Sequence, residues 1–136
     1  MSDVVAPVIP FLRYRDPAAA IDWLCLAFGF EVLETTTGGE GQVVHAELRW
    51  GIGTFQLGPA GSSTLPMGSP RDLPFTSQGV YVYIGDDVDT HHDRAVAAGA
   101  EVVMPLTDTD YGSREYVVRD FEGHLWGFGS YAPKLD

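Results

Sequence analysis

The sequence predicts an α+β fold made of two β-α-β-β-β modules in a pseudo-twofold arrangement, with curved mixed sheets around a shared cleft. Three observations predict it. Landmark residues recur 70 positions apart, each helical segment has one extended run before it and three after it, and half of the 136 residues is 68. The landmark pairs are Asp16 and Asp86, Gly29 and Gly99, Glu31 and Glu101, and Val32 and Val102. We therefore expect a duplicated module.

The first module begins with an extended run at residues 8–14, which leads into a well-marked helix. Asp16 can cap this helix, and Pro17 suits its first position. Strands are expected at 30–36, 42–50 and 54–57, with glycine-rich turns at 38–41 and 51–53 between them. The buried face of the helix, read from the i, i+3, i+4, i+7 spacing, consists of Ile21, Leu24, Cys25 and Phe28.

The second module repeats this order. An extended run at 80–84 is followed by a helix that starts near Asp86 or Asp87 and ends at Gly99, a residue suited to a left-handed cap. Strands are expected at 101–106, 114–119 and 124–131. The residues expected on the buried face of this helix are Val88, His92, Ala95 and Val96.

The modules form one domain over residues 1–136, with module one at 7–58 and module two at 79–132. A four-stranded sheet with one helix can cover only one face, so each module needs the other. Residues 58–78 between them hold three Gly, four Pro and four Ser and are not expected to be regular. They are either a plain linker or a loop that closes over the cleft.

The charge balance excludes one class of partner. The chain has 8 Lys and Arg against 19 Asp and Glu, a net charge of −11, which opposes binding to nucleic acid or to an anionic membrane. The same excess keeps a protein soluble and favours small cations or a basic surface as partners. With Cys25 as its single cysteine, the chain can form no internal disulfide, and we expect a buried thiol and a cytoplasmic location.

No targeting segment is expected. Asp3 precedes the apolar patch near the amino terminus, and Pro7 and Pro10 interrupt it, whereas a secretory signal has a basic start and an unbroken apolar run. No apolar stretch approaches the roughly 20 residues of a membrane helix.

The segment 114–126 carries a turn of the form Arg119-Asp120-x-x-Gly123-His124 before the last strand. Together with the duplicated module, it resembles the vicinal oxygen chelate superfamily, which includes glyoxalase I, extradiol dioxygenases, fosfomycin-modifying enzymes and bleomycin-resistance proteins. That turn usually has Pro where this chain has Phe121. The resemblance covers residues 8–131 and implies the fold more strongly than any one activity, because the scaffold hosts several chemistries.

Enzymes of that superfamily hold a divalent metal with side chains from the first and last strands of each module. The resemblance places those positions at Ile9, Gln56, Val80 and Gly127, where 80 − 9 and 127 − 56 both equal 71. Three of these side chains offer no donor, and the Gln56 amide is a weak one, so no metal is expected there. The alternative is a Zn, Ni, Mn or Fe site built from His45, Glu47 and a third ligand, since alternating residues share a strand face.

Without a metal, the chain most resembles the bleomycin-resistance type, a homodimeric protein that sequesters a bulky drug in a cleft. The acidic excess would favour a cationic ligand. Residues expected to face the cleft include Ile9, Val80, Val82, Ile84, Gly127 and Gly129, and Trp126 and Trp23 are expected in the core or, for Trp23, at a subunit contact. The candidate ligand-binding residues are Phe11, Arg13, His45, Trp50, Gln56, Tyr111 and Glu115.

Arg13 leaves two interpretations open. Inside the cleft it needs an anionic partner, either Glu115 or the ligand, whereas at a strand end it can reach solvent. Two alternative functions also remain. One is a metal-dependent lyase, transferase or dioxygenase of the glyoxalase kind, and the other is a metal-free enzyme with Glu115 or His45 as general base. The sequence identifies no catalytic residue.

Overall fold

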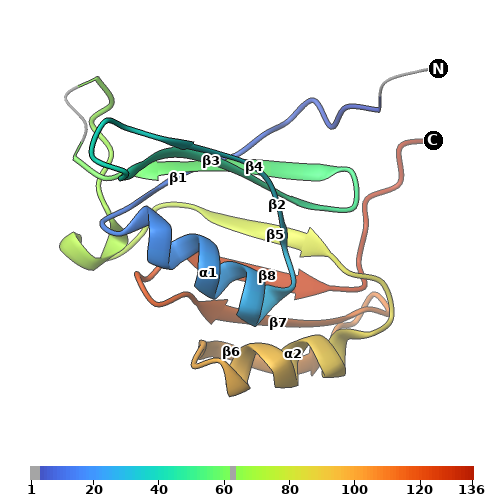
Figure 1. Cartoon of the computed structure of the whole chain (residues 1–136). Coiled ribbons are helices and arrows are strands. Elements are labelled where there is room, and N and C mark those ends of the chain that lie inside the picture. Colours follow the sequence, from blue (N-terminus) through green and yellow to red (C-terminus); the bar gives the residue numbers. More distant parts are fainter. Residues whose placement is uncertain (1–3, 62–63) are drawn as a thin grey trace.

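The structure is a computed structural model that describes residues 4–61 and 64–136; Asp3 and linker residues 62 and 63 lie outside the described residues. Two modules follow one another along the chain (Figure 1). Their elements are β1 (Phe11–Tyr14), α1 (Pro17–Phe28), β2 (Glu31–Thr37), β3 (Val43–Trp50) and β4 (Gly53–Pro59), the 3-10 turn η1 (Pro70–Asp72), then β5 (Gly79–Tyr83), α2 (Val88–Ala97), β6 (Glu101–Asp108), β7 (Arg114–Arg119) and β8 (Leu125–Gly129).

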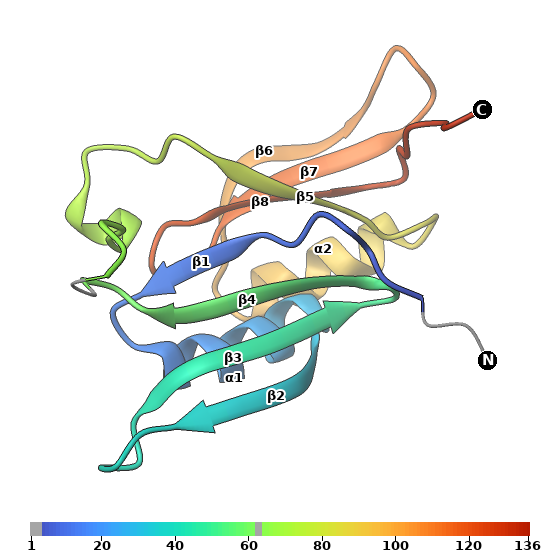
Figure 2. The ribbon, with the colours of Figure 1, turned by 90° about the horizontal axis from the view of Figure 1, so that it is seen from above.

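Each module forms one four-stranded mixed sheet, and both sheets have the same strand order. Sheet A is β1-β4-β3-β2 and sheet B is β5-β8-β7-β6. The pairs β1/β4 and β5/β8 are parallel, and the remaining neighbours are antiparallel. Figure 2 shows the sheets next to one another, with β1 and β5 as neighbouring edges and both helices behind them. The predicted α+β fold of two β-α-β-β-β modules is confirmed.

Local signals delimit the first helix as predicted. The Asp16 carboxylate accepts a hydrogen bond from the amide of Ala19 at 3.1 Å, and Gly29 ends the helix in the left-handed region with φ of 78°. Cys25, expected to be buried, is half-buried, because Ala20, Leu24 and Phe28 occupy the centre of the packed face.

The predicted face of the second helix needs a correction. The helix begins at Val88 after Asp87, and its buried residues are Val88, His91 and Ala95. His91 lies one turn after Val88, and Ala95 lies two turns after Val88. His91 is therefore the buried histidine in place of His92, and Val96 is 41% exposed.

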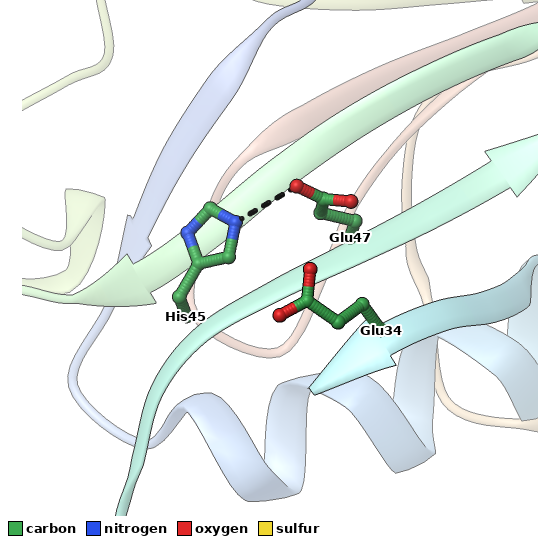
Figure 3. A group of neighbouring side chains, drawn as sticks. All are labelled: Glu34, His45 and Glu47. Atoms are coloured by element: carbon green, nitrogen blue, oxygen red, sulfur yellow. Dashed lines mark hydrogen bonds and ion pairs between the residues drawn. The ribbon is translucent and has the colours of Figure 1, made fainter. Parts of the chain in front are cut away.

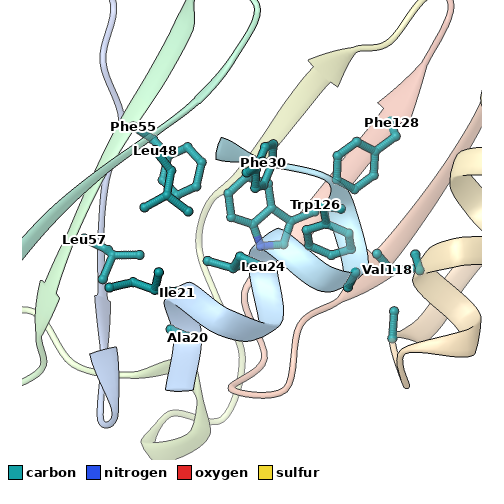
Figure 4. Packing of buried hydrophobic residues seen from close by; sticks show 14 of the residues in the cluster. Ala20, Ile21, Leu24, Phe30, Leu48, Phe55, Leu57, Val118, Trp126 and Phe128 are labelled. Atoms are coloured by element: carbon teal, nitrogen blue, oxygen red, sulfur yellow. The ribbon is translucent and has the colours of Figure 1, made fainter. Parts of the chain in front are cut away.

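One hydrophobic core serves both modules. Phe28 of α1 contacts Trp126 and Phe128 of sheet B at ring-centroid distances of 5.7 and 4.7 Å, and Phe55 of sheet A lies 5.1 Å from Trp126 (Figure 4). The helices also pack against each other. Neither sheet could bury its apolar face without the other module, as expected of a sheet with a single helix.

Trp23 also joins the modules. Its indole nitrogen donates to the carbonyl oxygen of Ala98 at 2.9 Å, and its ring lies 5.9 Å from that of Phe121. Trp23 thus uses its polar edge inside the chain and packs against the core, as in the first of its two expected places.

A buried acidic turn between β7 and β8 links module two to module one. Asp120 accepts hydrogen bonds from the Tyr14 hydroxyl at 2.6 Å and from the Trp126 indole at 3.0 Å. Burial, reinforced by the Asp120 charge, raises the pKa of Tyr14 well above its ordinary value, so this phenol remains a donor. Glu122 accepts from the amides of Arg15 and Asp16 at 2.7 and 3.0 Å.

The connection between the modules is anchored at its middle. Ser69 is fully buried and donates to Glu122 at 2.6 Å. Asp72 in η1 pairs with Arg15, and the Arg71 guanidinium donates to the carbonyl of Phe121 at 2.6 Å. These contacts of residues 69–72 therefore attach the middle of the connecting segment to both modules. No helix among the described residues is long and apolar enough to cross a membrane.

Candidate functional site

A groove follows the seam between the two sheets at its β3–β4 end. We call it the hairpin groove; its volume is about 660 Å³. Its floor reaches the core at Phe30, Phe55 and Trp126, and Tyr83, which is 53% exposed, stands on one wall. The remaining lining comes from the chain before β1, the β3–β4 hairpin and β5, namely Val8, Pro10, Trp50, Gly51, Ile52, Gly53, Thr54, Val80, Tyr81, Val82, Ile84 and Gly85.

A second groove of about 510 Å³ lies at the other end of the seam, between β1 and the connecting segment; we call it the linker groove. Phe11 and Arg13 line it from β1, His124 from the turn before β8, and Leu125 from the start of β8. Residues 66–68 and 76–78, with Pro70 and Leu73, form the opposite side. The two grooves share Val8, Pro10 and Val80, so they form one continuous seam.

The structure distributes the seven predicted ligand-binding residues over four places. Phe11 and Arg13 line the linker groove, and Trp50 lines the hairpin groove. His45 and Gln56 lie on sheet A in neither of these grooves. Glu115 lies in β7, and Tyr111 lies in the turn before it, with its hydroxyl 3.3 Å from Glu115. Neither residue lines a groove.

The predicted pairing of Arg13 with Glu115 is not formed. Glu115 interacts with Tyr111 and accepts a hydrogen bond from the Ser113 hydroxyl at 3.2 Å. No carboxylate among the described residues forms an ion pair with Arg13, and its Nε is buried without a hydrogen-bond partner.

The residues expected to face one cleft are divided between the two faces of sheet B. Phe11 pairs with Gln56 and Tyr81 with Gly127, so the offset is 70 between β1 and β5 but 71 between β4 and β8. Val80 and Val82 consequently lie with Trp126 and Phe128 on the face toward the helices, and from there they line the hairpin groove. Gly127 and Gly129 lie on the opposite face beside Tyr81.

The superfamily metal positions do not fit a metal ion. Of Ile9, Gln56, Val80 and Gly127, only Gln56 carries a donor, and the register places Val80 on the opposite face from Gly127. The hydroxyl of Tyr81, beside Gly127, donates to the carbonyl of Tyr131 at 2.8 Å. A divalent ion needs three or four converging donors, which these residues do not supply.

A different group of potential ligands lies on sheet A. One ligand atom each from Glu34, His45 and Glu47 falls within 4.8 Å of the others, across the β2/β3 pair (Figure 3). His45 Nε2 is 3.1 Å from Glu47, and Glu34 accepts from the Thr36 hydroxyl at 2.6 Å. Glu34 lies where a third ligand beside His45 and Glu47 could come from.

Sequence reasoning missed Tyr81, Tyr83 and Phe55 as lining residues of the seam. The signal that could have found the tyrosines is strand parity. Trp126 and Phe128 mark the core side of the last strand, and residues of β5 that alternate with Val80 and Val82 then lie on the other side.

Comparisons with known proteins agree with this geometry. The family model described as "Glyoxalase/Bleomycin resistance protein/Dioxygenase superfamily" matches residues 4–128. An uncharacterized protein of Mycobacterium tuberculosis (strain ATCC 25618 / H37Rv) is 34% identical over 125 residues, which are 88% of this chain and 71% of the relative.

Two solved structures extend the comparison. TioX from Micromonospora sp. ML1 is 37% identical, with a TM-score of 0.73 over 96% of this chain and 100% of TioX. The fosfomycin resistance protein FosX from Listeria monocytogenes has a TM-score of 0.68 over 98% of this chain and 97% of FosX. At 17% identity, FosX supports a shared fold alone.

Proposed function

We propose that this chain, which belongs to the glyoxalase/bleomycin resistance protein/dioxygenase superfamily, binds a bulky, largely apolar small molecule in the seam between its modules, without a metal ion at the superfamily's metal positions. The hairpin groove carries this proposal. Its volume of about 660 Å³ suits a drug-sized ligand, and its lining is mostly apolar and aromatic, as is common in small-molecule sites.

The groove leaves large apolar side chains exposed to water. Tyr83 and Tyr81 are 53% and 42% exposed, and Ile52 at the hairpin is 65% exposed. A contiguous exposed apolar patch costs solvation free energy unless a ligand or partner covers it. Flat rings on both walls favour a ligand with a planar apolar portion, because aromatic stacking adds to the free energy of burial.

Binding is tested with N-phenyl-1-naphthylamine, a neutral apolar probe whose fluorescence rises on leaving water. We expect saturable binding to the native chain and about tenfold weaker binding to Tyr83→Ala, because loss of a stacking ring costs about 1.4 kcal/mol. Tyr111→Ala is the matched control, since Tyr111 is 64% exposed and lines neither groove. Equal weakening by both substitutions, or no saturable binding, would contradict the proposal.

We also propose that the chain works as a homodimer. The faces of both sheets that point away from the helices have no element of the described chain over them, and Phe11, Tyr81 and Tyr83 are exposed there or at the adjoining strand edges. Sedimentation equilibrium tests this: twice the chain mass of 14.8 kDa is expected, and a monomer at micromolar concentration would contradict it.

A metal-dependent enzyme is the second candidate, and the group Glu34, His45 and Glu47 favours it. Imidazole and carboxylate together suit Zn, Mn or Fe. Elemental analysis of protein purified without chelators separates the candidates. Less than stoichiometric metal supports the binding protein, whereas one equivalent that is lost in His45→Ala supports the enzyme.

A further inference from the structure

Arg13 differs from every other arginine of the chain. Arg15, Arg114 and Arg119 pair with carboxylates, and Arg49, Arg71 and Arg94 donate to carbonyl oxygens. The guanidinium of Arg13 makes no hydrogen bond and no ion pair with any residue that the structure describes. Its side chain is partly buried, and its Nε is shielded from water.

The fold makes room for this unpaired cation. Arg13 and Gly58 face each other in the parallel β1/β4 pair, and the guanidinium lies over Gly58, where an added Cβ would collide with Nη1. A guanidinium remains protonated at any physiological pH. Burial of Nε without a hydrogen-bond partner costs free energy, and an anionic group that reaches the half-buried guanidinium would offset that cost.

We propose that the linker groove receives the anionic end of the ligand, an oxygen anion such as a carboxylate, sulfonate or phosphate, which pairs with Arg13. This rests on the proposed function, because the apolar body of the same ligand lies along the continuous seam toward the hairpin groove. The guanidinium presents planar donors that match such anions.

The net charge of −11 does not oppose this assignment at contact distance. The net charge acts over long range and is screened by salt, whereas a direct contact with a half-buried guanidinium is screened much less. The carboxylate of Glu47 on sheet A interacts with His45. The carboxylate of Glu115 on sheet B interacts with Tyr111 and Ser113. The ligand class expected from net charge alone, a cation, is thereby replaced by an amphiphilic anion.

Two fluorescent probes with the same ring system test the proposal. 8-Anilinonaphthalene-1-sulfonate carries an anionic group, and N-phenyl-1-naphthylamine lacks it. In the full chain we expect the sulfonate to bind about tenfold more tightly, and Arg13→Gln to abolish this preference while leaving the neutral probe unaffected. Arg49→Gln, which removes the same charge from sheet A outside both grooves, should keep the preference.

Two further variants locate the effect at the guanidinium. Gly58→Ala keeps the charge but displaces Nη1, and should reduce sulfonate affinity severalfold, whereas Arg13→Lys should restore part of what Arg13→Gln loses. Equal affinity of both probes for the native chain would overturn the pairing of an anion with Arg13 but not the proposed function. Equal effects of Arg13→Gln and Arg49→Gln on sulfonate affinity would do the same. Failure of the neutral probe to bind would overturn the proposed function as well.

Discussion

At the scale of single residues, Glu122 shows how a sequence motif acquires a structural role. This glutamate is 1% exposed, and its carboxylate accepts hydrogen bonds from the Arg15 and Asp16 amides and from the Ser69 hydroxyl. It therefore connects module two, the start of α1 and the connecting segment. A glutamate next to a Gly-His turn gives no hint in sequence of three partners that lie more than 50 residues away.

Glu122→Gln is predicted to lower the free energy of unfolding by about 2–3 kcal/mol. The charge-assisted hydrogen bonds become neutral ones, and the glutamine NH₂ group, itself a donor, must face the donors that the carboxylate accepted from. Urea titration followed by circular dichroism measures the change. Glu40→Gln, at an exposed position, should stay within about 0.5 kcal/mol of the native chain. Equal effects of the two substitutions on the free energy of unfolding would show that the buried Glu122 carboxylate does not hold the two modules together.

His91 makes stability depend on pH. Its Nε2 donates to the carbonyl of Phe28 at 2.8 Å, and its Nδ1 lies 2.6 Å from the Tyr116 hydroxyl, which can donate to the neutral ring. Burial lowers the pKa of His91 below its ordinary value of 6.5, and the nearby Arg94 charge acts in the same direction. The unfolded chain then binds a proton that the folded chain does not.

The stability contributed by neutral His91 is complete above pH 6.5 and is lost as the pH falls below it toward the folded pKa. We expect the free energy of unfolding to decline between pH 6.5 and 5 by up to about 1.4 kcal/mol per pH unit from this site. The His91→Gln variant should show a shallower slope, and His92→Gln the native slope. A native slope in His91→Gln would contradict this assignment.

At the scale of elements, the turns that begin and end them are the best-determined features. Gly29 has φ of 78°, and an added Cβ would lie 3.0 Å from Arg94 Nη1 and 3.2 Å from the Trp50 ring. Gly51 has φ of 59° with open space around it. Gly51→Ala should cost about 1 kcal/mol from the left-handed backbone alone, and Gly29→Ala about 2–3 kcal/mol, because crowding adds to it. Thermal unfolding compares the two, and equal losses would mean that packing around Gly29 adjusts freely.

The elements also show how far sequence reasoning reaches. The Asp16 cap, Pro17 and Gly29 are local signals, and they delimited α1 correctly. The facing of β5 was not predictable from the repeat, because one extra residue in the β7–β8 turn, relative to the β3–β4 turn, changes the offset from 70 before that turn to 71 after it. Applying the offset of 71 to β5 assigns its side chains to the wrong face. Of the predicted residues, Phe11, Arg13 and Trp50 line the grooves. Tyr81 and Tyr83 line the hairpin groove too, but their prediction depended on the facing of β5.

At the scale of the whole molecule, the two modules are predicted to unfold as one unit. Phe28 and Phe55 of module one both contact Trp126 of module two in a single core, and the Glu122 carboxylate accepts hydrogen bonds from module one at the edge. Opening either module would expose the apolar face of the other, which costs about 25 cal/mol for each Å² uncovered. Partly folded states should therefore be too unstable to populate.

Equilibrium unfolding in urea tests this cooperativity with two probes. Tryptophan fluorescence reports on Trp23, Trp50 and Trp126, each of which contacts a residue of the other module. Far-ultraviolet circular dichroism reports on all helices and strands. We expect coincident midpoints, and Glu122→Gln should shift both equally, because an edge contact then stabilises the whole chain. Separate midpoints, or a shift confined to fluorescence, would mean that each module keeps its secondary structure after the seam has opened. The ligand grooves would then belong to an interface that can separate while the modules stay folded, and ligand should stabilise only the fluorescence transition.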